Sequence, residues 1–90
     1  MEFKQDPGRF YQTDEQGRTV AEVTFPLTEP GVMEINHTFV DESLRGQGVA
    51  GKLILAVASY AKEHGMKIVP TCSYAVKWFK THPEYRELLK

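Results

Sequence analysis

The stretch "VDESLRGQGVAGKL", from Val40 to Leu53, joins a glycine-rich turn to the start of a helical pattern. Gly46, Gly48 and Gly51 carry no side chain, so the backbone can approach a ligand closely at these positions. The first N–H groups of a helix have no partner within it, and they carry the positive end of its dipole. A phosphate or pyrophosphate binds well there. The stretch therefore predicts an anion-binding turn, and a turn used only for tight packing is the competing interpretation.

The segment after the turn is predicted to be an amphipathic helix. Its apolar residues recur at alternating spacings of three and one, which places them on one face: Ala50, Leu53, Ile54, Val57, Ala58 and Ala61. His64 and Gly65 end the helix, with glycine where a left-handed residue is favoured.

The segments before the turn are predicted to be strands. Residues 9–13 and 18–27 flank a cluster of turn residues, which indicates a hairpin, and residues 28–31 form a second turn. Residues 32–40 then alternate between apolar or aromatic side chains and polar ones, so we expect one continuous strand. The residues of the first kind, on one face, are Met33, Ile35, His37 and Phe39.

The last third of the chain is predicted to hold one strand and two helices. Residues 67–72 form a short strand, parallel to the strand before the helix because a helix joins them. Pro70 suits an edge or the end of that strand. Ser73 is expected to cap a short helix, and Thr81 with Glu84 has the form of a capping box for another.

These elements predict one domain, residues 1–90, of the α+β class. The expected order is β-β-β-α-β-α-α, an α/β sandwich with helices packed on a mixed sheet of about four to five strands. The 90 residues are 41% hydrophobic and 26% charged, which is typical of a soluble globular domain.

Composition also excludes several classes of protein. A net charge of −1 argues against a non-specific nucleic-acid binder. Cys72 is the single cysteine, so no intramolecular disulfide forms, and the histidines lack metal-ligand spacing to it, so no metal is expected. The N-terminus lacks the apolar region of a signal peptide, and no apolar run approaches a membrane span. We therefore expect a cytoplasmic protein that does not contact membranes.

The glycines literally spell G-x-G-x-x-G, but two nucleotide-binding motifs fit poorly. No acidic residue follows at the distance that the dinucleotide fold requires, and the motif follows the third strand rather than the first. In the P-loop motif a Ser or Thr follows the lysine, and none follows Lys52.

The other parse is Arg45-Gly46-Gln47-Gly48-Val49-Ala50, which reads R-x-x-G-x-A after a strand ending in valine. This pattern resembles motif A of the GNAT acyl-CoA N-acyltransferases. More narrowly, the chain looks like the short, stand-alone GNAT-like proteins, which carry "HT-x-V" before the loop and Cys-x-aromatic after the next strand. Here these are His37–Val40 and Cys72–Tyr74.

The resemblance implies acetyl-CoA as acyl donor and assigns two groups of residues to it. The strand residues that would hold the pantetheine arm and the thioester carbonyl are Thr38, Phe39 and Val40. The residues whose backbone amides would take the pyrophosphate are Arg45, Gly46, Gln47, Gly48, Val49, Ala50 and Gly51.

Four residues are candidates for the chemistry itself. Glu34 lies on the strand where many GNAT enzymes place a carboxylate base, and His37 lies nearer the expected thioester. Many GNAT enzymes use a tyrosine on the following helix as general acid, and Tyr74 follows the last strand somewhat earlier than that tyrosine. Cys72 precedes a helix, where a thiol is activated, and is a candidate acyl acceptor or proton donor. A solvated carboxylate, a structural histidine and a buried apolar cysteine are the alternatives.

The predicted function is transfer of an acetyl group from CoA to an amine by direct attack. The alternatives are an acyl-CoA-binding regulatory module with little turnover and an interaction domain without a cofactor. The link between residues 9–13 and 18–27 is only a turn, where full GNAT domains insert helices that help to form the acceptor site. The acceptor side should therefore be open to a small-molecule, peptide or protein amine, and the chain a monomer or weak dimer.

Overall fold

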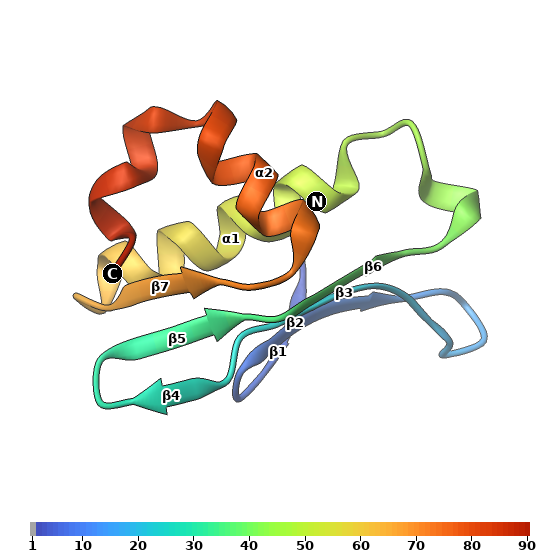
Figure 1. Ribbon diagram of the computed structural model, residues 1–90. Coiled ribbons are helices and arrows are strands. Elements are labelled where there is room, and N and C mark those ends of the chain that lie inside the picture. The colour runs from blue at the N-terminus through green and yellow to red at the C-terminus, as the bar shows by residue number, and fades with distance from the viewer. Residues whose placement is uncertain (1) are drawn as a thin grey trace.

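The computed structural model describes residues 2–90, and these form two small β-sheets with the helices packed on one face (Figure 1). The first sheet is antiparallel, with strand order β1-β2-β3-β6. Its strands are β1 (Lys4–Asp6), β2 (Arg9–Thr13), β3 (Thr19–Thr24) and β6 (His37–Val40). The predicted hairpin is confirmed, because β2 pairs antiparallel with β3. The short, polar β1 was not expected.

The second sheet has the order β4-β5-β7. It contains β4 (Leu27–Glu29), β5 (Val32–Ile35) and β7 (Lys67–Pro70). The predicted parallel pairing of the strands before and after the long helix is confirmed by β5 and β7. Pro70 ends β7 opposite Ile35, as its missing N–H requires. The exposed strand β4 was expected to be part of a turn.

The expected continuous strand 32–40 changes partners at Asn36, and this corrects both the number of strands and the number of sheets. Asn36 N–H donates to Thr24 O at 3.3 Å, although Thr24 is already the register partner of His37. Two residues therefore oppose one, which is a β-bulge. The extra residue exchanges the faces of the strand: Ile35 is fully buried, whereas His37 is exposed.

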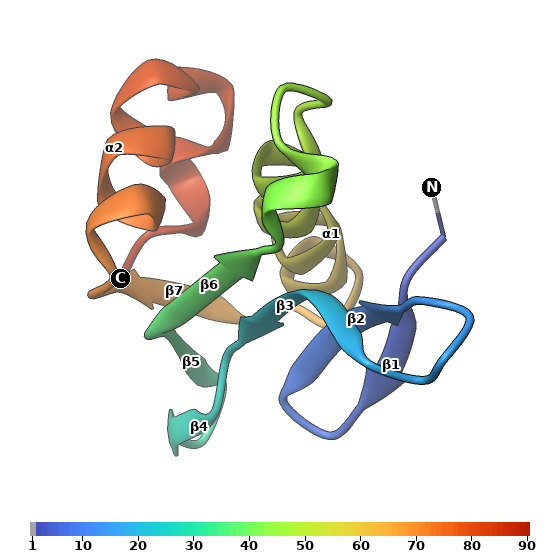
Figure 2. The ribbon, with the colours of Figure 1, turned by 90° about the vertical axis from the view of Figure 1, so that its right-hand side faces the viewer.

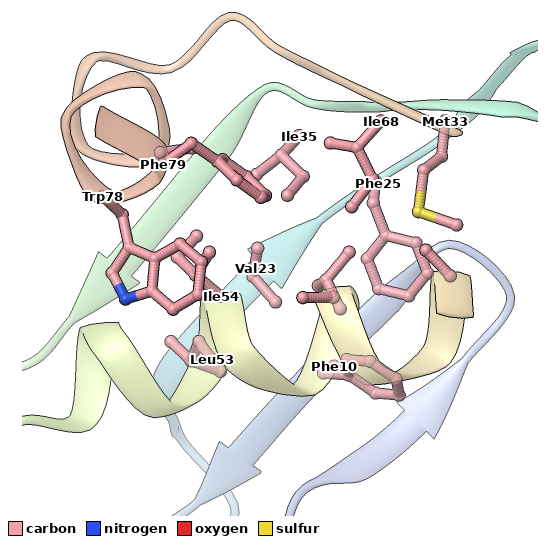
Figure 3. Close-up of a cluster of buried hydrophobic side chains, with 14 of the residues drawn as sticks. Phe10, Val23, Phe25, Met33, Ile35, Leu53, Ile54, Ile68, Trp78 and Phe79 are labelled. Atoms are coloured by element: carbon pink, nitrogen blue, oxygen red, sulfur yellow. The ribbon is translucent and has the colours of Figure 1, made fainter. Parts of the chain in front are cut away.

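The long helix α1 (Val49–Glu63) packs its apolar stripe on both sheets, and the stripe is the predicted one except at its start, where Val49 rather than Ala50 is buried. Leu53 and Ile54 are fully buried and meet strand residues such as Val23 in the core (Figure 3). Burying such a side chain stabilises the fold by about 1.5–3 kcal/mol. Gly48 is the N-cap, with φ 71°, and Gly65 follows the helix with φ 63°, the left-handed conformation expected of it.

The C-terminal elements differ from the prediction in how they begin. Helix α2 (Ser73–Thr81) is capped by Cys72, whose sulfur accepts the Ala75 N–H at 3.4 Å, so Ser73 is not the cap. Thr81 is the last residue of α2 and donates to Trp78 O at 3.0 Å. It therefore caps nothing, and the segment that follows is the 3₁₀ helix η2 (Pro83–Leu88).

The α+β class and the sandwich of helices on sheets are confirmed. Trp78 and Phe79 of α2 reach the same core as α1, so both helices cover one face of the sheets (Figure 3). Within residues 2–90, the helices are too short or too polar to cross a membrane.

Candidate functional site

A cavity of about 370 Å³ lies between β6, the loop before α1 and the start of α2. Figure 2 shows α1 and α2 beside each other above β6. We call this space the loop cavity. Its lining contains all but one of the residues predicted to hold the acyl donor, together with two others: Thr38, Phe39, Val40, Leu44, Arg45, Gly46, Gly48, Val49, Ala50, Gly51 and Tyr74.

The first wall of the loop cavity is the unpaired edge of β6. This strand is the last of its sheet, so only one of its edges is bonded to a neighbour, β3. Asp41 N–H donates to Val20 O at 2.7 Å toward β3. Backbone N–H groups alternate along a strand, so those of Thr38 and Val40 point away from β3, toward the open edge. Because the chain changes sheets at Asn36, the free edge of β6 keeps main-chain donors and acceptors available to a ligand.

The second wall is the glycine loop. The N–H groups from Gly46 to Gly51 make no hydrogen bond to any other part of residues 2–90. Gly46 and Gly48 have φ of 83° and 71°, a left-handed backbone that side-chain-bearing residues rarely adopt. Arg45 is exposed at this wall and has no carboxylate partner in the described chain. These donors, with the positive end of α1, favour an anion of several oxygens.

A short 3₁₀ helix, η1 (Glu42–Leu44), comes directly before the glycine loop. The Asp41 carboxylate accepts the Ser43 hydroxyl at 2.6 Å and the Ser43 N–H at 3.0 Å. These two hydrogen bonds lower the pKa of Asp41, the hydroxyl contributing most. The same two hydrogen bonds fix the turn at Ser43 from which the glycine loop continues.

Cys72 contacts both β5 and β6, the two strands that meet at Asn36. Its Sγ lies 3.1 Å from Thr38 Oγ1, across from β6. The backbone N–H groups of Thr71 and Cys72 both donate to Ile35 O, at 3.0 and 3.1 Å, where β5 ends. The thiol is partly exposed and free. It caps α2 and also lies next to the open edge of β6.

Tyr74 and Gly51 meet where α2 approaches α1. A Cβ built on Gly51 would lie 3.5 Å from Tyr74 Oη and 3.7 Å from Trp78 Nε1. These are ordinary contact distances, so the packing of α1 beside α2 does not require a glycine at this position. Tyr74 is 40% exposed and lines the loop cavity.

Four predicted site residues lie outside the lining of the loop cavity: Gln47, Cys72, His37 and Glu34. Gln47 is exposed in the loop, Cys72 lies beside Thr38, and His37 and Glu34 lie on the face of the sheets opposite the helices. The Thr71 hydroxyl donates to Glu34 Oε2 at 2.5 Å. His37 Nε2 lies 3.4 Å from Glu22 Oε1.

Sequence reasoning missed two residues of the site. Leu44 lines the loop cavity and packs against the core, but an isolated leucine in a loop carries no signal. Glu22 was unremarkable in a strand, and its position beside His37 depends on the register between β3 and β6. Within residues 2–90, no group of three metal-ligating side chains occurs.

Comparison with known proteins places this arrangement in a class. Residues 9–88 match the family model described as GCN5-related N-acetyl-transferase. A solution structure of a GCN5-like protein from Staphylococcus aureus has 34% identity and a TM-score of 0.83, covering 99% of this chain and 87% of that one. The crystal structure of an Escherichia coli GNAT family N-acetyltransferase in complex with CoA has 25% identity and a TM-score of 0.59, covering 69% and 38%.

The chain belongs to the GCN5-related N-acetyltransferase family. Protein NATD1 from Mus musculus is 33% identical over 61 residues, which are 66% of this chain and 56% of that protein. Protein NATD1 from Homo sapiens has the same identity over the same length. The chain thus spans about half the length of the curated relatives that it matches.

Proposed function

We propose that the chain is an N-acetyltransferase that transfers the acetyl group of acetyl-CoA directly to an amine. The observation that carries this proposal is the combination of two walls in one cavity. One is the unpaired edge of β6, and the other is the run of unpartnered N–H groups from Gly46 to Gly51.

Each wall suits a different part of the acyl donor. The pyrophosphate would accept hydrogen bonds from the loop N–H groups, and the exposed Arg45 adds a positive charge at the same wall. The pantetheine arm contains amides, which would pair with the open edge of β6 as an added strand would. Both walls are backbone, so they recognise the donor without a special side chain.

The chemistry requires one bond to form and one to break. The amine nitrogen bonds to the acetyl carbonyl carbon while the carbon–sulfur bond breaks. One backbone N–H of this edge, that of Thr38 or that of Val40, would donate to the carbonyl oxygen as negative charge develops on it, and one such donor contributes about 10²–10³ in rate. Binding both reactants side by side removes much of the entropic barrier.

The ammonium nitrogen must also lose two protons, and the departing thiolate must gain one. His37 would accept the proton of the incoming ammonium on the uncovered face of the sheet, where an amine can approach. Cys72, beside Thr38, would give its thiol proton to the departing thiolate, and the second proton, lost by the nitrogen as the amide forms, would pass to solvent, from which Cys72 regains one. Tyr74 would close the donor side of the loop cavity, and Glu34, held by Thr71, is a second candidate to accept the proton.

One observation favours the alternative of an acyl-CoA-binding module with little turnover. His37 and Glu34 do not line the loop cavity. Binding and turnover must therefore be measured separately, because only an enzyme loses rate without losing donor affinity when these residues change.

The first test is thermal unfolding with and without 1 mM acetyl-CoA. A ligand at 100 times its Kd adds about 2.7 kcal/mol, which raises Tm by roughly 10 °C or more in a domain of this size. We expect this rise in the wild type and its loss in Gly48→Glu, because a carboxylate would oppose the pyrophosphate.

Gly17→Glu is the matched control. Gly17 also has a positive φ, 82°, and open space around it, but it lies in the β2–β3 turn. Gly17→Glu introduces the same backbone strain and the same change of charge, but outside the lining of the loop cavity. The rise in Tm with acetyl-CoA should therefore remain. No rise in the wild type would overturn the proposal. A rise without thiol release from acetyl-CoA in the presence of a lysine-containing peptide would favour the binding module.

A further inference from the structure

We infer that Glu22 is a positioning residue that orients His37 for proton transfer, and that Arg9 balances the charge of Glu22. This inference rests on the proposed function, because it assigns His37 the task of accepting the ammonium proton. Glu22 touches neither substrate and would act only through His37.

The register of the first sheet brings Glu22 and His37 together. Glu22 of β3 pairs with Phe39 of β6, and His37 lies two residues before Phe39, on the same face. Such diagonal neighbours lie within reach of long side chains. His37 Nε2 and Glu22 Oε1 are 3.4 Å apart, on the face that the helices leave open.

The second carboxylate oxygen of Glu22 is held from the other side. Arg9 Nε donates to Glu22 Oε2, and the remaining guanidinium nitrogens donate to Asp6 Oδ2 at 3.1 Å and Thr19 Oγ1 at 3.2 Å. The Arg9 guanidinium also lies over the Tyr11 ring, 3.8 Å from its centroid. The hydrogen bond to Glu22 is the main cause of the raised pKa of Arg9. The carboxylate is therefore fixed in direction before an acceptor arrives.

This arrangement suits a base that must be neutral and correctly turned. A carboxylate beside Nε2 favours a proton on that nitrogen, which leaves Nδ1 with the lone pair that accepts a proton. The charged groups of this network are Glu22 on β3, Arg9 on β2 and Asp6 on β1. Arg9 holds one oxygen of Glu22 while the other lies beside His37, so the carboxylate that orients the imidazole is itself fixed and balanced in charge.

The test measures kcat for acetyl transfer, and the Kd of acetyl-CoA, in Glu22→Gln, His37→Gln and the double variant. We expect Glu22→Gln to lower kcat about tenfold with Kd unchanged, since it impairs the base but not the donor site. In the His37→Gln background the same change should have no further effect on kcat. Glu29→Gln, whose carboxylate pairs with Lys90 on the second sheet, is the control and should keep the wild-type rate.

The pH profile of kcat supplies the second readout. Loss of the negative charge in Glu22→Gln should move the acidic limb of the profile to lower pH, and loss of the positive charge in Arg9→Met should move it to higher pH. Should Glu22→Gln unfold, Glu22→Asp serves instead, because its shorter arm withdraws the carboxylate from His37 while keeping the charge. A merely structural role would not shift the acidic limb in opposite directions in the two variants.

The outcomes separate this inference from the proposed function. If His37→Gln lowers kcat but Glu22→Gln does not, or lowers it equally in both backgrounds, the inference is overturned and the proposed function stands. If His37→Gln leaves kcat unchanged, the base is elsewhere and the inference is again overturned. If the wild type binds acetyl-CoA but transfers no acetyl group, the proposed function and this inference both fail.

Discussion

At the scale of single residues, the sulfur of Cys72 has two contacts that substitution can separate. It accepts the Ala75 N–H as the cap of α2, and it lies beside Thr38 Oγ1 at the open edge of β6. A serine at this position would keep the cap and remove the thiol. An alanine would remove both.

We therefore predict different effects of Cys72→Ser and Cys72→Ala on stability and the same effect on rate. Loss of the cap in Cys72→Ala should cost about 1 kcal/mol, whereas Cys72→Ser should unfold close to the wild-type denaturant midpoint. Both should lower kcat by about 10²-fold with donor affinity kept, because neither offers a thiol proton. If Cys72→Ser turns over at the wild-type rate, the thiol is only a cap.

At the scale of elements, the helix and loop could be predicted from local patterns, but the split strand could not. The apolar stripe of α1 and the glycines before it are signals carried by neighbouring residues. The bulge at Asn36 depends on which strand each half of residues 32–40 meets in space, through Thr24 of β3 and Ile35 of β5. Simple alternation therefore placed His37 on the face of Ile35, which is wrong. The capping box at Thr81 failed for a similar reason, because α2 runs through it.

The residues of the site also divide into those that local sequence predicts and those that depend on strand pairing. Residues that contribute backbone, such as Thr38 and Gly48, could be predicted because a loop and a strand end define them. The partner of His37 could not, because Glu22 is distant in sequence and meets it only through strand register.

Two glycines of the loop should respond oppositely to alanine. Gly48 has φ 71°, so Gly48→Ala forces a left-handed alanine and should cost about 1 kcal/mol. Gly51 lies in α1 with helical backbone, and a Cβ there makes ordinary contacts of 3.5 and 3.7 Å with side-chain ends. Gly51→Ala should therefore stabilise the chain by about 0.4–1 kcal/mol. Thermal unfolding of the two variants measures both changes, and a destabilised Gly51→Ala would mean that α1 and α2 tolerate no added methyl group.

At the scale of the whole molecule, no helix covers the second face of the sheets (Figure 1). The side chains of this face are mostly polar. The large apolar side chains that remain exposed belong to separate elements: Leu27 on β4, Phe39 on β6, Leu55 on α1 and Tyr74 on α2. A stable interface between copies needs roughly 1,000 Å² or more with a largely apolar centre. Scattered apolar residues of this kind do not supply one.

We therefore predict that the chain is a monomer, with the open face left for an acceptor. Sedimentation velocity at 10 and 200 µM, with and without CoA, should give the mass of one chain at both concentrations. Leu27→Ser is the control: Leu27 is 66% exposed, so replacing it should not alter the sedimentation coefficient. A dimer in the wild type that dissociates in Leu27→Ser would contradict the prediction. It would also mean that an edge strand of the second sheet joins two copies and that the acceptor meets a composite surface.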